Sequence, residues 1–161
     1  MNLVLRALST RQLNAGLAVL RVITGIIFVA HGAQKLFSFG ISGVSGAFSG
    51  MGIPLASVMA PLVSVLEFAG GFALIAGLMT RPVSLGLAGT MLGAIIFAHL
   101  PAGFFLPNGA EFALALLGST VLFTLVGGGE WSVDSVLSRR MVAQPAANIS
   151  DSSARGQMRV A

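Results

Sequence analysis

The chain has no cysteine and no tyrosine, and only 9% of its 161 residues are charged. Without cysteine it cannot form disulfides, thiolate metal sites, cysteine-attached haem or thiol–disulfide exchange. Soluble globular proteins carry about 25% charged residues, so this composition argues strongly against a water-soluble domain. Hydrophobic residues make up 55% of the chain and the mean hydropathy is +0.93, while 21 glycines favour closely packed helices in lipid.

Four apolar runs predict helices that cross a membrane, because about 20 residues span a hydrocarbon layer of about 30 Å. These runs are residues 13–37, 53–79, 82–100 and 111–126. Backbone groups in lipid must bond to one another, so helices are the expected spanning elements. The sequence therefore predicts an all-α integral membrane four-helix bundle, with residues 13–137 as its membrane domain.

The sequence allows two starting points for the second span, each at a proline. Either the helix starts near Pro54 and Pro61 kinks it, or the membrane part begins at Pro61 after a short interfacial turn. In the preceding loop, residues 38–52, Val44, Phe48 and Met51 have helical spacing. We expect this loop to form a short amphipathic helix on the outer surface.

The arginines outside the apolar runs predict the topology. Arg6 and Arg11 precede the first span, Arg81 separates the second from the third, and Arg139 and Arg140 follow the fourth. All lie on one side of a protein with four spans, and by the positive-inside rule that side is cytoplasmic. We therefore expect cytoplasmic termini: a segment at 1–12 and a disordered tail at 138–161. The basic pI of about 11.5 then reflects membrane orientation and not nucleic-acid binding.

A weak repeat relates the two halves of the chain. Residues 25–31 read Gly-Ile-Ile-Phe-Val-Ala-His, and residues 93–99 read Gly-Ala-Ile-Ile-Phe-Ala-His. The triplet Glu-Phe-Ala occurs at 67–69 and again at 111–113. The matches are short, so chance similarity between apolar segments is the alternative to two repeated helical hairpins.

A small set of polar residues falls inside or at the ends of the spans. A charge at the bilayer centre costs about 2.5–3.5 kcal/mol on insertion scales, so such residues face the bundle interior and find partners. They are Arg21, His31, Gln34, Lys35, Glu67, His99 and Glu111.

The positions of these residues predict where they gather. His31 and Lys35 are four residues apart and share one helix face, with Gln34 beside them, and the two glutamates and two histidines fall in the outer half. We expect Arg21, nearer the cytoplasm, to reach Glu67 across the bundle. Structural roles are the alternative: an ion pair that fixes helix register, and a Lys35 that reaches the outer headgroups.

Three chemistries fit two histidines, two carboxylates and a lysine on four helices. Metal binding is not favoured, because the spacing is not a Glu-x-x-His pattern. Haem is not favoured either, because both histidines lie at the outer edge of a small bundle. A quinone needs an apolar slot with groups that bond its carbonyls and exchange protons, and this cluster supplies them. We predict His31, Glu67, His99 and Glu111 as the proton-exchanging residues and Lys35, Gln34 and Arg21 as quinone-binding residues.

Taken together, the motifs of the chain resemble the DoxX family of small four-helix bacterial inner-membrane proteins, over about residues 13–137. The residues that carry the resemblance are Leu20-Arg21, Gly25, Phe28, His31-Gly32, Lys35-Leu36-Phe37, Gly52-Ile53-Pro54, Glu67, Gly70-Gly71, Gly77-Leu78, Thr80-Arg81, His99-Leu100, Gly103-Phe104-Phe105, Glu111-Phe112 and Trp131-Ser132-Val133-Asp134. The resemblance implies a subunit in a redox complex, since the wider family includes the DoxD-type subunit of archaeal thiosulfate:quinone oxidoreductase and proteins associated with oxidative-stress and thiol homeostasis.

We therefore expect an inner-membrane redox subunit that contacts quinone and binds a protein partner or further copies of itself. A non-catalytic scaffold that recruits a soluble partner is the first alternative. A small transporter or proton path from Glu67 toward Arg21 is the second.

Overall fold

A computed structural model describes residues 9–141, and these residues form helices joined by turns, without a strand. The elements, in chain order, are α1 (Thr10–Ala33), the π-helix η1 (Gln34–Phe39), α2 (Gly40–Gly50), α3 (Ala56–Ala76), α4 (Thr80–Ala94), the π-helix η2 (Ile95–His99), the 3₁₀ turn η3 (Leu100–Ala102) and α5 (Glu111–Val126). A further helical segment covers 133–141. The tail predicted to be disordered therefore begins in a helix, and its residues 142–161 lie outside the described part, as do residues 1–8.

Four of these helices account for the four predicted spans, which confirms the all-α membrane bundle. Three helical runs are long and apolar enough to cross a bilayer: Thr10–Gly50, Ala56–Ala76 and Thr80–Ala102. The fourth, α5, is apolar but has only 16 residues, or about 24 Å at 1.5 Å per residue. The predicted loop helix is also present, as α2.

The structure decides where the second span begins. Helix α3 begins at Ala56, two residues after Pro54, and Pro61 lies inside the helix. At its other end Gly77 has a φ of +71°, a left-handed conformation that suits glycine and ends the helix. Because α4 begins at Thr80, the second and third spans are joined by a tight turn at residues 77–79.

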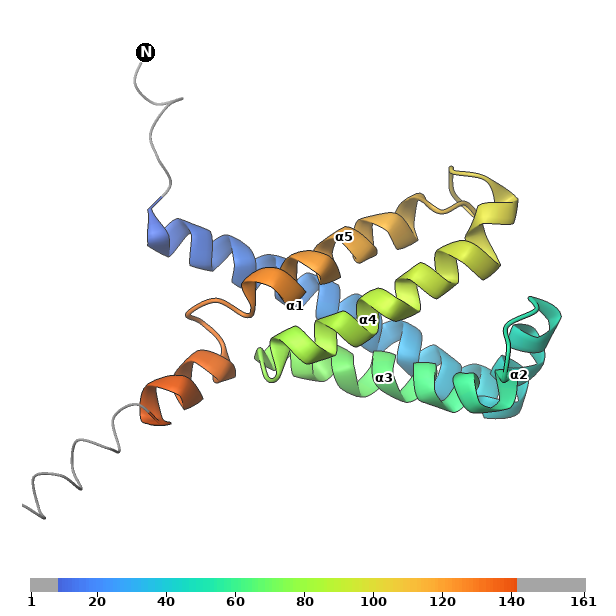
Figure 1. Ribbon diagram of the computed structural model, residues 1–161, viewed down its shortest axis with the longest axis horizontal. Coiled ribbons are helices and arrows are strands. Elements are labelled where there is room, and N and C mark those ends of the chain that lie inside the picture. Colours follow the sequence, from blue (N-terminus) through green and yellow to red (C-terminus); the bar gives the residue numbers. More distant parts are fainter. Residues whose placement is uncertain (1–8, 142–161) are drawn as a thin grey trace, which may run out of the picture.

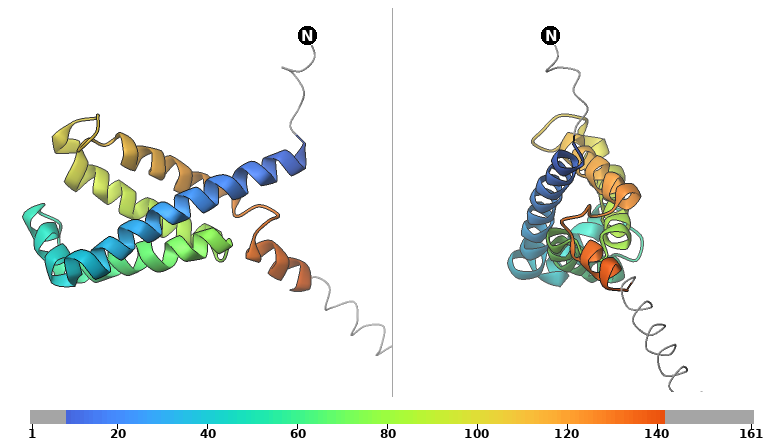
Figure 2. Two further views of the ribbon diagram at one scale, coloured as in Figure 1. Left: turned by 180° about the vertical axis from the view of Figure 1, so that it is seen from behind. Right: turned by 90° about the vertical axis from the view of Figure 1, so that its left-hand side faces the viewer.

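The helices form two pairs, one from each half of the chain. Helix α1 packs mainly against α3, and α4 packs mainly against α5. Figure 1 shows the two pairs meeting near the α3–α4 turn and diverging toward α2, and the rear view in Figure 2 shows the same divergence. This arrangement agrees with two repeated hairpins, although α2 interrupts the first.

Glycines set the close approach within the first pair. A Cβ at Gly71 would lie 2.7 Å from the backbone nitrogen of Val29 and 2.8 Å from the carbonyl oxygen of Gly25. A Cβ at Gly32 would overlap the backbone of Phe68. The backbones of α1 and α3 therefore touch where side chains are absent, as in other membrane helix pairs.

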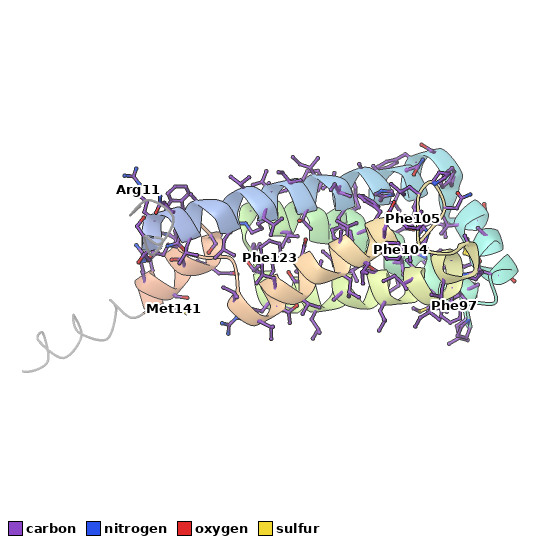
Figure 3. The ribbon with its side chains drawn as sticks, turned by 90° about the horizontal axis from the view of Figure 1, so that it is seen from above. Arg11, Phe97, Phe104, Phe105, Phe123 and Met141 are labelled. Atoms are coloured by element: carbon purple, nitrogen blue, oxygen red, sulfur yellow. The ribbon has the colours of Figure 1, made fainter. Side chains whose placement is uncertain are left out.

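The two ends of the bundle differ in charge. Arg11 and Met141 lie at one end in Figure 3, and α4, whose first two residues are Thr80 and Arg81, begins at the same end. We call this the basic end. The opposite end, which we call the α2 end, carries α2 and the 103–110 loop, with Phe104 and Phe105. The segments that carry arginine therefore lie at one end of the bundle, and the two connections without lysine or arginine, α2 and the 103–110 loop, lie at the other.

Candidate functional site

A cavity of about 110 Å³ lies between the two helical pairs, toward the α2 end. Four of the seven predicted site residues line it: His31 from α1, Lys35 from η1, Glu67 from α3 and His99 from η2. The rest of the wall is apolar and consists of Phe28, Met91, Ala94, Phe112, Ala113 and Leu116. The cavity therefore combines a slot of apolar side chains with four groups able to bond or exchange protons.

An ion pair joins the two sides of the first helical pair at this cavity. The ammonium Nζ of Lys35 donates to the carboxylate Oε2 of Glu67, and only 4% of the Glu67 side chain and 20% of the Lys35 side chain are exposed. Lys35 therefore points into the bundle and does not reach for the headgroups, contrary to the alternative expected from sequence. Within residues 9–141 no hydrogen bond is made to the other oxygen, Oε1, of this cavity-lining side chain.

Two π-helical segments carry two of these side chains. Lys35 lies in η1 and His99 lies in η2. A π-turn inserts an extra residue into a helix, which rotates the following side chains relative to the α-helical register, and such turns occur often at functional sites. Both segments lie toward the α2 end of their spans, where the cavity is.

The ring of His99 is held by the loop that follows it. Its Nδ1 lies 2.9 Å from the carbonyl oxygen of Asn108. Because a carbonyl oxygen only accepts, Nδ1 carries the hydrogen, which leaves the lone pair of the neutral ring on Nε2. His31 has a different environment: its ring faces the ring of Phe112 on α5, with centroids 6.2 Å apart. The two histidines approach the cavity from opposite helical pairs.

Two predicted residues lie near the α2 end but do not line the cavity. Glu111 begins α5, and its Oε1 accepts a hydrogen bond of 2.8 Å from the backbone N–H of Leu106, which fixes the 103–110 loop. Gln34 is exposed on the outside of η1. Glu111 thus has a structural contact of its own, and the structure does not bring Gln34 to the cluster.

The expected ion pair between Arg21 and Glu67 is not formed, so that expectation is wrong. Arg21 is 3% exposed and lies near the basic end, where its two Nη atoms donate to the carbonyl oxygens of Gly128, at 2.7 Å, and Trp131, at 2.8 Å. The physical reason is distance along the helix. Lys35, fourteen residues after Arg21, lies at the level of Glu67 and pairs with it, whereas Arg21 lies too far toward the basic end. Arg21 instead ties α1 to the segment after α5.

The same segment caps α4 from a distance in sequence. The carboxylate of Asp134 accepts the backbone N–H groups of Met79, at 2.7 Å, and Thr80, at 2.8 Å. Burial by itself raises the pKa of Asp134, but the hydrogen bonds from Thr80 and Met79 and the charge of Arg21 outweigh it and hold this pKa below its ordinary value. We call these contacts of Arg21 and Asp134 the basic-end lock.

Sequence reasoning missed this lock, although a signal for it was present. Met79, which precedes α4, offers no side-chain cap, so the first amide groups of α4 needed an acceptor from elsewhere. Asp134, in the Trp131-Ser132-Val133-Asp134 motif, is of a residue type whose side chain accepts backbone N–H groups at helix starts.

The cavity offers acid–base groups more than metal ligands. Within residues 9–141 no three or more His, Asp or Glu side chains are grouped so as to hold a metal ion. One carboxylate, one ammonium and two imidazoles around an apolar slot are suited to hydrogen bonding and proton exchange with a small polar head.

Comparison with known proteins agrees with the fold. The DoxX family model matches residues 16–100. Over 124 residues the chain is 37% identical to "Putative oxidoreductase CatD" of Bacillus subtilis, covering 77% of this chain and 88% of that protein. It is 32% identical over 133 residues to "Inner membrane protein YqjF" of Escherichia coli (79% and 95% covered) and 32% identical over 135 residues to "Uncharacterized membrane protein Rv3486" of Mycobacterium tuberculosis (77% and 82%). No solved structure matches significantly. The chain belongs to the DoxX family.

Proposed function

We propose that this protein is the membrane subunit of a redox complex, and that its cavity binds the polar head of a quinone. The observation that carries the proposal is the cavity itself, with four polar side chains on one apolar slot between two helical pairs. A cavity of about 150 Å³ is known to hold a benzene ring, so a space of about 110 Å³ is of the right order for a single ring.

The residues around the cavity fit the two protonation states of such a head. The ammonium of Lys35 and a ring N–H of His31 are donors, which suit the carbonyl oxygens of the oxidised form. Nε2 of His99 and Oε1 of Glu67 are acceptors, which suit the hydroxyl groups of the reduced form. A bound quinone would supply the two-electron chemistry, and these side chains would bond its oxygens and take up or return its protons.

The electrons would have to come from elsewhere. The chain has no cysteine, so it can supply neither a dithiol nor thiolate ligands for an iron–sulfur cluster. We propose a protein partner that carries the electron donor. The name of the Bacillus subtilis relative, "Putative oxidoreductase CatD", supports a redox role.

We also propose a location and an orientation. The Escherichia coli relative is named an inner membrane protein, and we propose the same membrane here. Arg11 lies at the basic end, Arg139 and Arg140 directly precede Met141 there, and Arg81 is in the first turn of α4, which begins at that end. The positive-inside rule therefore favours a cytoplasmic basic end with both termini. The α2 end and the cavity would then lie toward the outer leaflet.

One observation favours a second candidate, a scaffold without chemistry. The Lys35–Glu67 ion pair joins α1 to α3 and would fix the bundle even if nothing entered the cavity. A proton path from Glu67 toward Arg21 has less support, because the nitrogens of Arg21 are engaged by the basic-end lock.

Titration of a quinone into the purified protein in lipid nanodiscs tests the proposal. We expect Glu67→Gln and His31→Ala to weaken binding at least about tenfold, since each removes a charged or hydrogen-bonding partner of the head, worth about 1.5–3 kcal/mol. Glu111→Gln is the matched control: it makes the same change outside the cavity lining. Equal binding by all four proteins would refute the quinone site and leave the scaffold.

A further inference from the structure

We propose that the cavity opens sideways into the bilayer, between α1 and α5, and that its ligand enters there carrying an apolar tail. The inference rests on the cavity of the proposed function, and it adds the class of ligand: a lipid-soluble molecule with a polar head, which reaches the site from the leaflet at the α2 end. His31 and Phe112 form the two sides of the opening.

The exposure of the lining residues locates the opening. The inner wall is closed, since Phe28, Glu67, Met91, Ala113 and Leu116 are all buried. His31 is exposed, and Phe112 is 41% exposed. Lys35 lies one helical turn nearer the α2 end than His31, yet only 20% of its side chain is exposed. A cavity that opened at the end of the bundle would show the reverse order, so the opening is on the side.

The packing of the helices places the opening in the seam between α1 and α5. Both helices have a close partner within their own pair, but they touch each other only sparsely. The divergence of the two pairs toward α2 widens this seam at the level of the cavity (Figures 1 and 2). Across it, the rings of His31 and Phe112 face each other at 6.2 Å between centroids. Side chains alone, and not packed backbone, close the seam.

An ordered loop lies over the end of the second pair, at the α2 end. Backbone N–H groups of Ala110 and Glu111 donate to the carbonyl oxygens of Gly103 and Phe104, each at 3.0 Å. The hydrogen bond from Leu106 to Glu111 and the contact of His99 with the loop hold it further. This loop connects α4 to α5 over the end of the second pair (Figure 3, near Phe104).

The position of His31 indicates what kind of molecule fills the seam, because a histidine exposed to lipid needs a polar partner. Polar side chains within a bilayer normally face the bundle interior or a polar cavity, because exposure to hydrocarbon is unfavourable. His31 borders both the polar cavity and the lipid. A ligand with a polar head satisfies the ring from the cavity side, while its apolar tail lies against Phe112 and continues the lipid surface.

Tryptophan fluorescence tests the position of the opening without any ligand. Trp131 is the sole tryptophan, so Trp131→Phe gives a silent background for Phe112→Trp and His31→Trp. Lipids with brominated chains should quench both, and should also quench the positive control Leu114→Trp, on the exposed face of α5. Aqueous iodide should quench Ser49→Trp on α2 but neither residue of the seam. Quenching of Phe112→Trp by iodide and not by brominated lipid would overturn the sideways opening.

A second measurement tests the tail and separates the two proposals. A long-tailed quinone should reduce the quenching of Phe112→Trp by brominated lipid, because its tail displaces lipid chains from the seam, whereas a tail-less analogue should leave it unchanged. Binding of both with no change in quenching would refute entry through the seam and keep the quinone site. Quenching by lipid with no binding of either would refute the quinone site and keep the opening.

Discussion

Removing the charge of Lys35 should destabilise the bundle more than removing both charges of its ion pair. In Lys35→Met the carboxylate of Glu67, 4% exposed, loses its counter-charge, and breaking one side of a buried pair costs about 3–5 kcal/mol. Glu67→Gln should cost less, about 1–3 kcal/mol, because the 20% exposed Lys35 side chain keeps some access to a polar phase. In the double variant no buried charge remains, and replacing both partners is often close to neutral.

Because the double variant is close to neutral, the cycle of these variants predicts a coupling free energy as large as the two single effects together, about 4–8 kcal/mol. Unfolding by a denaturing detergent in mixed micelles, followed by the loss of helical circular dichroism, measures it. If the effects of the two single variants simply add in the double variant, the residues do not interact in the bilayer and the ion pair contributes nothing to the bundle.

The same double variant distinguishes a structural from a functional role for the pair. As a scaffold, the protein should regain both its stability and its partner binding when both charges are removed. As a quinone site, it should regain stability but still bind quinone weakly, since the ammonium donor is gone and a neutral amide replaces the carboxylate acceptor.

Three further predictions concern the packing and the basic-end lock. Asp134→Ala should lower the stability by about 1–2 kcal/mol, because two amide groups at the start of α4 lose their acceptor, and a melting curve in detergent measures it. The pKa of Asp134 is held below its ordinary value of 3.8, so its contribution is fully present above about pH 5 and lost as the pH falls below about 4. In Asp134→Asn the melting temperature should therefore fall less steeply with pH below about pH 4. If the fall is unchanged, other groups cause it. Gly71→Ala should cost about 1–3 kcal/mol by overpacking α1 against α3, whereas Gly89→Ala, with no atom within 4 Å of the added Cβ, should be neutral or slightly stabilising; equal melting points for the two variants would refute the close approach.

Much of the architecture followed from one-dimensional features of the sequence. The four apolar runs match four helices within a few residues, since a bilayer selects long apolar stretches and backbone groups in it must be paired. The helix of residues 40–50 was also predictable, from the helical spacing of its apolar residues. The start of α3 was not, because Pro54 and Pro61 are both compatible with the first turns of a helix.

The candidate site was predictable in composition but not in pairing. Intramembrane polar residues are rare enough that the sequence named all four polar residues that line the cavity. It also named Gln34, Glu111 and Arg21, which lie elsewhere, because counting residues along a span gives depth but not direction around the helix axis. The π-helices η1 and η2 change that direction by shifting the register, and nothing in the local sequence announced them.

By itself, the sequence determined that this protein is a four-helix membrane protein with one cluster of polar residues and one basic end. The small number of charged residues was sufficient for that, since a charge inside an apolar span is costly and is retained only where it has a partner or a function. The tertiary structure alone decided the partners: Lys35 with Glu67, Arg21 with the carbonyl groups after α5, and Asp134 with the start of α4. The physical reason is that partners are set by the crossing and divergence of the two helical pairs, a property of how glycine faces pack in three dimensions.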